Sequence, residues 1–201
     1  MAYPSVTSPY GLVPINLIGG QVFAGSTRLL PIATNSSTAI YYGDVVKLNS
    51  GGTLDKDTGT SAATPVGVFL GCTYTDPVYG KTFRQYYPGT TNITDVMAYV
   101  QDDPDALFKV AVVTAYNSTT ISYVNRTAVG NNAVLVQNSG STITGNSQVA
   151  ISATTNTTST WPVRIIDVVP ETALAGNPGS YTEVIVKWNQ GMHQYLNPTG
   201  V

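Results

Sequence analysis

Few residues in this 201-residue chain have side chains and spacings that could do chemistry. The only histidine, His193, lies in an irregular C-terminal segment, and the only cysteine is Cys72. Nucleophilic catalysis needs a nucleophile, a base beside it and a third group that orients the base. No local signature such as GxSxG accompanies His193, and one histidine with one cysteine cannot supply the ligands of a zinc site. We therefore expect neither an enzyme nor a bound metal or cofactor.

Two groups of aspartates are the next candidates. The run DKDTG at 55–59 resembles the start of a calcium loop, but its fifth residue is a glycine where an oxygen ligand is expected, and no later glutamate closes the cage. Asp102, Asp103 and Asp105 surround a proline and could hold a hard cation or act as a carboxylate pair. The same DDPD pattern is ordinary turn chemistry. We favour the turn and leave a cation at 102–105 as an alternative.

The composition favours strands as the elements that position these side chains. Only 10% of the residues are charged, whereas about a quarter are charged in an average globular domain. Disorder is not expected, because 42% of the residues are hydrophobic and the net charge is only −2. Serine, threonine, asparagine, glycine and valine dominate the chain. This composition predicts an all-β protein, folded as a single compact β-barrel or a jelly-roll-like sandwich.

Apolar runs bounded by turn residues predict individual strands. One strand is expected at 45–48 and the next at 65–70, with a Gly/Asp/Thr-rich turn region between them. Two further strands are expected at 96–100 and 108–113, on either side of the DDPD turn, and 182–188 alternates as a strand does. The segment 73–94 is expected to be a long loop with a short hairpin.

The N-terminal segment has its own character, because prolines and glycines interrupt its aliphatic residues and prevent a regular helix. We expect an extended arm over residues 1–21, lying on the protein's own surface or on a neighbour, and a β-rich domain over residues 22–201. The alternative is an ordinary first strand of that domain. The side chains expected to contact a neighbour are Leu12, Val13, Ile15, Leu17 and Ile18.

Aromatic residues gather in the segment 73–94. Tyrosine offers a rigid contact surface with a polar tip, which suits protein interfaces. We therefore predict Tyr79, Tyr86 and Tyr87 as interface aromatics. The alternative is that these tyrosines cover the end of a barrel.

The charge and the termini exclude several classes of partner. A net charge of −2 does not favour attraction to phosphate groups, so no nucleic-acid partner is expected. No run of about 18 apolar residues is present to span a bilayer, and no basic region precedes an apolar run as in a secretory signal. A single cysteine fits assembly in a reducing compartment.

Four phrases carry a resemblance that covers most of the chain, least clearly 116–160. They are PYGLVPINLIGG at 9–20, YYGDVVKL with TPVGVFLGC, DVMAYVQDDPDALFKVAV, and VIVKWNQGMHQYLNPTG. They resemble small structural proteins of tailed bacteriophages, in particular head-decoration, or cement, proteins. The resemblance implies a β-rich virion protein, commonly trimeric, which is assembled in the host cytoplasm. It would bind the outer surface of an icosahedral head and clamp neighbouring major capsid proteins. It transfers no individual site residue. With such a role, we expect the arm to face the capsid or a neighbouring chain through Leu12, Val13, Ile15, Leu17 and Ile18.

Two other functions stay open. The first is a phage tail or neck component or a host-glycan-binding β module, in which Trp161, Trp188 and exposed tyrosines form a sugar platform. Tryptophans are more often core residues. The second is a hydrolase that uses His193 or the aspartates at 102–105.

Overall fold

The computed structural model describes residues 6–90, 93–114 and 118–201, and this part of the chain is built almost entirely from β-strands. Its helical residues are confined to short 3-10 turns: η1 (Arg126–Ala128), η2 (Pro170–Thr172) and η3 (Gln194–Leu196). The all-β class predicted from the composition is therefore confirmed. Within the described ranges, no helix is long or apolar enough to cross a bilayer.

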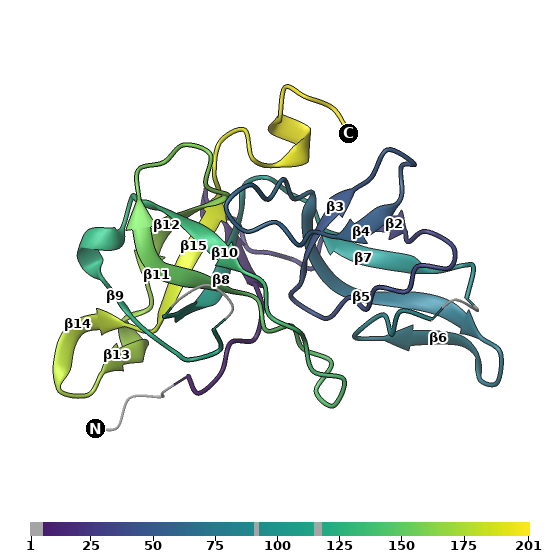
Figure 1. The fold of residues 1–201 in the computed structure, drawn as a ribbon, viewed down its shortest axis with the longest axis horizontal. Helices are drawn as coiled ribbons and strands as arrows, with labels where there is room; N and C mark the ends of the chain where they lie inside the picture. The colour runs from purple at the N-terminus through teal and green to yellow at the C-terminus, as the bar shows by residue number, and fades with distance from the viewer. Residues whose placement is uncertain (1–5, 91–92, 115–117) are drawn as a thin grey trace.

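Five strands close into a barrel at one end of the molecule (Figure 1): β8 (Ala106–Val113), β10 (Asn132–Val136), β11 (Ala150–Asn156), β12 (Val163–Val168) and β15 (Glu183–Trp188). Their order is β8-β11-β10-β12-β15, and β15 pairs back onto β8, which closes the ring. Only the β8 and β11 pair is parallel. The interior is apolar, with the rings of Phe108 and Trp188 5.2 Å apart between centroids. The predicted barrel is thus present.

Six further strands form an open sheet at the other end: β2 (Arg28–Pro31), β3 (Val45–Leu48), β4 (Leu54–Lys56), β5 (Gly67–Asp76), β6 (Gly80–Arg84) and β7 (Met97–Gln101). Their order is β2-β7-β5-β3-β4, and β6 pairs with β5. A β carbon at Gly67 would lie 2.1 Å from the carbonyl oxygen of Gln101, so β5 and β7 can approach this closely only at a glycine. This sheet has its own apolar cluster, which includes Phe69 and Tyr74.

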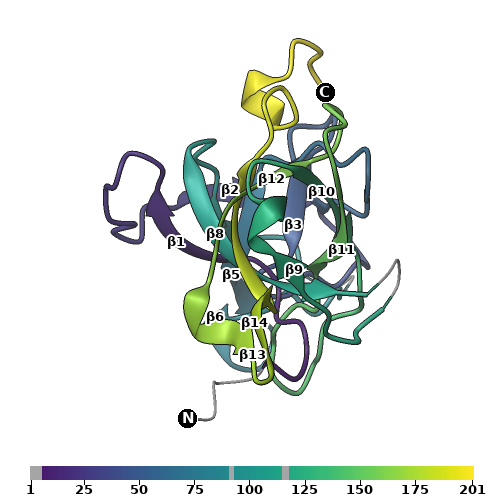
Figure 2. The same ribbon diagram turned by 90° about the vertical axis from the view of Figure 1, so that its left-hand side faces the viewer.

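A small third sheet covers the outer end of the barrel. It consists of β9 (Val124–Asn125), β13 (Ala173–Leu174) and β14 (Asn177–Tyr181), in the order β13-β14-β9. Figure 2 views the molecule from this end, with β9, β13 and β14 toward the viewer. The turn η1 follows β9 directly, so the segment β9–η1 packs on the barrel through Val124 and Ala128.

A buried carboxylate joins the barrel to the open sheet. Asp44, directly before β3, is fully buried and pairs with the Lys56 amine at 2.8 Å. It also accepts hydrogen bonds from the Tyr41 N–H at 2.8 Å and from the Ser147 hydroxyl at 2.6 Å. Ser147 lies between β10 and β11 of the barrel, so this bond crosses between the sheets. Gly11 is essential to the close packing here, because its φ is +88° and a β carbon would lie 2.8 Å from that of Ser147.

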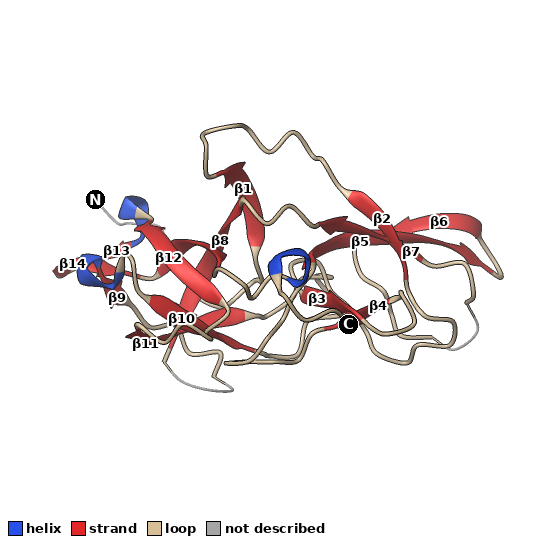
Figure 3. Cartoon of the chain, turned by 90° about the horizontal axis from the view of Figure 1, so that it is seen from above, coloured by secondary structure: helices blue, strands red, loops and turns tan. Residues whose placement is uncertain are grey.

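The C-terminal segment makes a second connection. After leaving β15, it reaches the open sheet, where η3 lies near β3 in Figure 3. The Gln194 side chain accepts from the Leu48 N–H at 2.7 Å and donates to the Leu48 carbonyl at 3.0 Å. The Gln194 N–H donates to the Pro65 carbonyl at 2.8 Å. This irregular segment is therefore fixed by contacts with a different sheet.

The N-terminal segment lies on the protein's own barrel. Residues Val13–Leu17 form β1, which pairs antiparallel with the first half of β8. Leu12 is fully buried in the barrel cluster. The prediction that Leu12 contacts a neighbour is therefore wrong, because this side chain fills the chain's own core. Residues 1–5 of the predicted arm lie outside the described residues.

Candidate functional site

His193 is a structural residue in this fold. Its side chain is fully buried, and Nδ1 accepts a hydrogen bond from the Tyr195 N–H at 3.3 Å, which caps η3. Burial lowers the pKa of His193, so the ring is neutral at pH 7. No serine or threonine hydroxyl of the described chain is hydrogen-bonded to the ring. The structure therefore does not bring His193 together with a nucleophile.

The aspartates at 102–105 form the predicted turn between β7 and β8. Asp103 accepts the N–H of Asp105 at 2.8 Å, as a turn aspartate does. Asp102 pairs with Arg28 at 2.9 Å and accepts from the Tyr195 hydroxyl at 2.9 Å. Asp105 pairs with Lys187 at 2.6 Å. These carboxylates thus have partners within the chain and do not converge on one point.

The run at 55–59 is likewise occupied by internal bonds. Asp55 accepts from the Asn49 amide at 2.8 Å, and Asp57 accepts the N–H groups of Gly59 and Thr64 at 2.8 and 3.0 Å. In the described ranges, no three acidic, histidine or cysteine side chains gather as metal ligands would. Both aspartates therefore serve the connections around β4.

The two tryptophans do not form a platform. Trp188 is only 3% exposed and packs against Phe108 inside the barrel. Trp161 is half-buried in the connection before β12. The suggestion that Trp188 contacts a sugar is therefore wrong, because its ring belongs to the core.

The three predicted interface tyrosines have different environments. Tyr87 is fully buried and its hydroxyl lies 2.8 Å from the Ser36 carbonyl. Its prediction as an interface residue is therefore wrong. Tyr86 is half-buried and stacks on Tyr41 with 5.5 Å between ring centroids. Tyr79 is 78% exposed at the tip of the β5–β6 hairpin.

Tyr79 belongs to an exposed apolar surface that we call the hairpin patch, formed by Val78, Tyr79 and Phe83. Val78 is 80% exposed and Phe83 is 60% exposed. The hairpin projects at the end of the molecule opposite the small sheet (Figure 1). Apolar side chains exposed on one projecting hairpin are a feature of surfaces that bind another protein. The hairpin patch is therefore the best candidate for a docking surface.

The backbone beneath the hairpin patch is held firmly. Asp76 accepts the N–H of Val78 at 2.9 Å and that of Tyr79 at 3.2 Å. These bonds lower the pKa of Asp76, so the carboxylate is charged and the bonds persist at neutral pH. Gly80 completes the turn with φ +73°. A preorganised tip loses little conformational entropy when it binds.

A second exposed apolar surface, the loop patch, consists of Ile18, Val22 and Leu29. They are 50%, 78% and 49% exposed, and they lie on and beside the connection from β1 to β2. This connection projects from the body in Figure 2. Of the residues predicted to contact a neighbour, Ile18 belongs to this patch. The others outside the core, Val13, Ile15 and Leu17, are half-buried on β1.

No protein-family model, no curated protein and no solved structure matches the chain. The interpretation of function therefore rests on the chain's own surfaces and on the resemblance of its sequence phrases. The hairpin patch combines exposure with a rigid backbone, whereas the loop patch lies largely on an irregular connection.

Sequence reasoning missed a polar cluster in which Tyr10, Lys109 and Glu183 meet. The Tyr10 hydroxyl donates to the buried Glu183 carboxylate, and the Lys109 amine lies 3.5 Å from that carboxylate. Burial, followed by the hydrogen bond to Glu183, raises the pKa of Tyr10. A phenol with a raised pKa is a poor proton donor to a substrate, so the cluster is best understood as an anchor of the N-terminal segment. Its members are far apart in sequence, and no local pattern could have revealed it.

Proposed function

We propose that this chain is a structural virion protein, a capsid decoration or cement protein of a tailed bacteriophage. It binds the outer surface of the icosahedral head and stabilises contacts between major capsid protein subunits, as a homotrimer. The sequence phrases at 9–20, 41–48, 64–72, 95–112 and 184–200 supply the family resemblance. The observation that carries the proposal is the hairpin patch, an apolar surface that stays largely exposed although one edge of Phe83 packs on Tyr99.

Exposing this apolar surface to water costs free energy. Val78, Tyr79 and Phe83 would each gain from removal of their apolar area from water, at about 25 cal/mol per Å². A capsid lattice offers many copies of the complementary surface, so a trimer would engage several subunits together. Linked contacts act at a high effective concentration, and modest individual affinities then give slow release. Such a protein needs exposed anchors on a rigid body more than it needs a deep pocket.

The test is cosedimentation of the purified chain with phage heads that lack their decoration protein. We expect saturable binding, with a stoichiometry that matches the three-fold positions of the head. A double variant, Tyr79→Ser with Phe83→Ser, should bind more than about tenfold more weakly, since loss of a central aromatic anchor typically costs about 2 kcal/mol or more.

The matched control is Tyr123→Ser, which removes an exposed tyrosine, 45% exposed, at the opposite end of the molecule. It should bind heads as the unchanged protein does. Failure of the unchanged protein to bind any head would refute the proposal. Unchanged affinity of the double variant would refute the role of the hairpin patch. Sedimentation equilibrium of the free protein checks for three chains per particle.

A further inference from the structure

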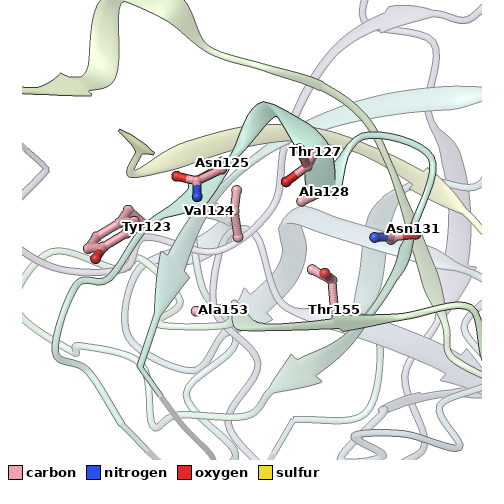
Figure 4. Close-up of a pocket in the computed structure, with 8 residues that line it drawn as sticks. All are labelled: Tyr123, Val124, Asn125, Thr127, Ala128, Asn131, Ala153 and Thr155. Carbon is pink, nitrogen blue, oxygen red and sulfur yellow. The ribbon is translucent and has the colours of Figure 1, made fainter. Parts of the chain in front are cut away.

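A small polar pocket opens on the barrel, between the segment β9–η1 and β11 (Figure 4). Its volume is about 210 Å³. Val124 and Ala128 are buried members of the barrel cluster, and Ala153 packs against that cluster, so the floor of the pocket is apolar. The remaining lining residues are polar or amphipathic: Tyr123, Asn125, Thr127, Asn131 and Thr155.

The rim offers hydrogen-bonding groups that the fold does not use. The side chains of Thr127, Asn131 and Thr155 form no hydrogen bond with the described part of the chain. Asn125 uses its Oδ1 to accept from the Ser180 hydroxyl at 3.1 Å, and its amide N–H groups donate to no group of the described residues. In Figure 4, Thr127 and Thr155 lie on opposite sides of the opening. The rim can therefore donate and accept hydrogen bonds from several directions.

The pocket carries no net charge. None of its lining residues is ionisable at neutral pH. Arg126 lies between two lining residues in the sequence, but it pairs with Asp167 at 3.2 Å. The lining offers no unpaired charge of opposite sign to an ionic ligand. The free-energy cost of removing such a ligand from water would therefore not be compensated. The lining therefore favours a neutral ligand with many hydroxyl groups.

We propose that this pocket binds one ring of a neutral sugar. A pyranose ring has hydroxyl groups around its edge and C–H groups on its faces, which match the polar rim and the apolar floor. Tyr123, 45% exposed at the edge of the pocket, presents an aromatic ring for stacking. The volume lies below the 300–1,000 Å³ that is typical of drug-sized ligands, so one ring fits better than an oligosaccharide.

The position of the pocket makes sugar binding compatible with docking. The segment β9–η1 and the hairpin patch lie at opposite ends of the long axis of the molecule (Figure 1). A chain docked through its hairpin would present the pocket away from the docking surface. Sugar binding does not depend on the proposed attachment to a capsid, and each can be tested without the other.

The experiment is a titration of the full ¹⁵N-labelled chain, followed through its backbone amide signals. The probes are the methyl glycosides of glucose, galactose and mannose, and N-acetylglucosamine, with glucuronate as a charged comparison. We expect saturable shifts at residues 123–131 and 153–155 with at least one neutral probe, with a dissociation constant in the millimolar range because the site is small. Glucuronate should bind more weakly than the glucoside.

Two variants test the assignment of the site. Tyr123→Ala and Asn131→Ala should each weaken binding of the neutral probe severalfold. Tyr79→Ala, a change at another exposed tyrosine that lies far from the pocket, should leave the titration unchanged. Both target side chains lack internal hydrogen bonds in the described chain, so the variants should fold, and their amide spectra will show this. The proposal is overturned if no neutral probe shifts these amides, if glucuronate binds more tightly, or if both variants bind as the unchanged protein does.

Discussion

Replacing Asp44 with alanine should be among the most damaging single changes to this protein. The carboxylate is fully buried, and the side chain of its partner Lys56 is only 11% exposed. The change leaves this amine without its countercharge, and it also leaves the Tyr41 N–H and the Ser147 hydroxyl without their acceptor. Removing one partner of a buried ion pair costs about 3–5 kcal/mol. We expect the free energy of unfolding to fall by that amount.

The loss should also weaken the coupling between the barrel and the open sheet, because the bond from Ser147 crosses between them. Unfolding of the barrel and of the open sheet in urea can be followed with two different spectroscopic signals. Tryptophan fluorescence reports on the barrel, since Trp188 lies in its core and Trp161 stands before β12. Near-ultraviolet circular dichroism includes the tyrosines of the open sheet. In the unchanged protein the two signals should change together, whereas in Asp44→Ala they should diverge.

The matched control is Asp95→Ala. Asp95 accepts from the Thr75 N–H and hydroxyl at 2.9 and 2.6 Å and pairs with Lys81 at 3.4 Å, but these contacts are exposed and compete with water. Asp95→Ala should lower the free energy of unfolding by only a small fraction of what Asp44→Ala does. If Asp44→Ala were no more destabilising than the control, the reasoning that this network joins the sheets would be refuted. A double-mutant cycle with Lys56→Met then isolates the coupling of the pair.

Three further predictions follow from burial and close packing. Burial lowers the pKa of His193, so the unfolded chain takes up a proton at a higher pH than the folded chain does. The free energy of unfolding should therefore be constant above about pH 6.5 and fall below it, by at most about 1.4 kcal/mol per pH unit. His193→Gln should reduce this dependence in urea midpoints measured from pH 8 to pH 5, and an unchanged slope would contradict the prediction. Cys72 is fully buried, and burial raises its pKa to about 12; a thiol-specific reagent at pH 8 should react only after unfolding, and rapid labelling of the native chain would be inconsistent with this. Gly67→Ala should lower the thermal midpoint strongly, because the new methyl group would lie 2.1 Å from the carbonyl oxygen of Gln101; a midpoint within the measurement error of the unchanged protein would show that β5 and β7 can separate there.

Local patterns predicted the strands that have clear boundaries. The apolar runs at 96–100 and 108–113 became β7 and β8, and the aspartates between them formed the expected turn. The alternating run at 182–188 became β15. In each case the apolar residues and the turn residues are adjacent in the sequence, so the information needed is local.

Local sequence patterns could not predict which distant strands pair with each other. The closure of the barrel joins β8 to β11 and to β15, and alternation in one strand carries no information on its partner. The short hairpin expected within 73–94 is present as β6 and the end of β5, but local patterns did not predict that β5 continues unbroken from Gly67 to Asp76. Cross-strand pairing stabilises these residues despite their glycine and charged side chains, because β5 already has β7 on its other side.

Burial of individual side chains was also only partly predictable. Tyr79 is exposed as expected, but Tyr87 is buried because its hydroxyl finds a backbone carbonyl acceptor inside the fold. The polar tip that suggested an interface is equally compatible with a core position. The pocket beside Tyr123 had no sequence signal, since its residues belong to a Ser/Thr/Asn-rich stretch without a motif.

In the sequence, the strands of the open sheet lie between β1 and the five barrel strands, and this determines the order in which the protein can fold during synthesis. All strands of the open sheet lie within residues 28–101, so they can pair as soon as this stretch leaves the ribosome. The barrel cannot close until β15, at residues 183–188, has been made. Contacts between such distant residues form slowly, and until then β8 and β12 have free edges that can pair with other chains. Newly made chains are therefore most prone to aggregate in the interval before the last strand arrives, and a chain that ends before β15 should accumulate in insoluble form.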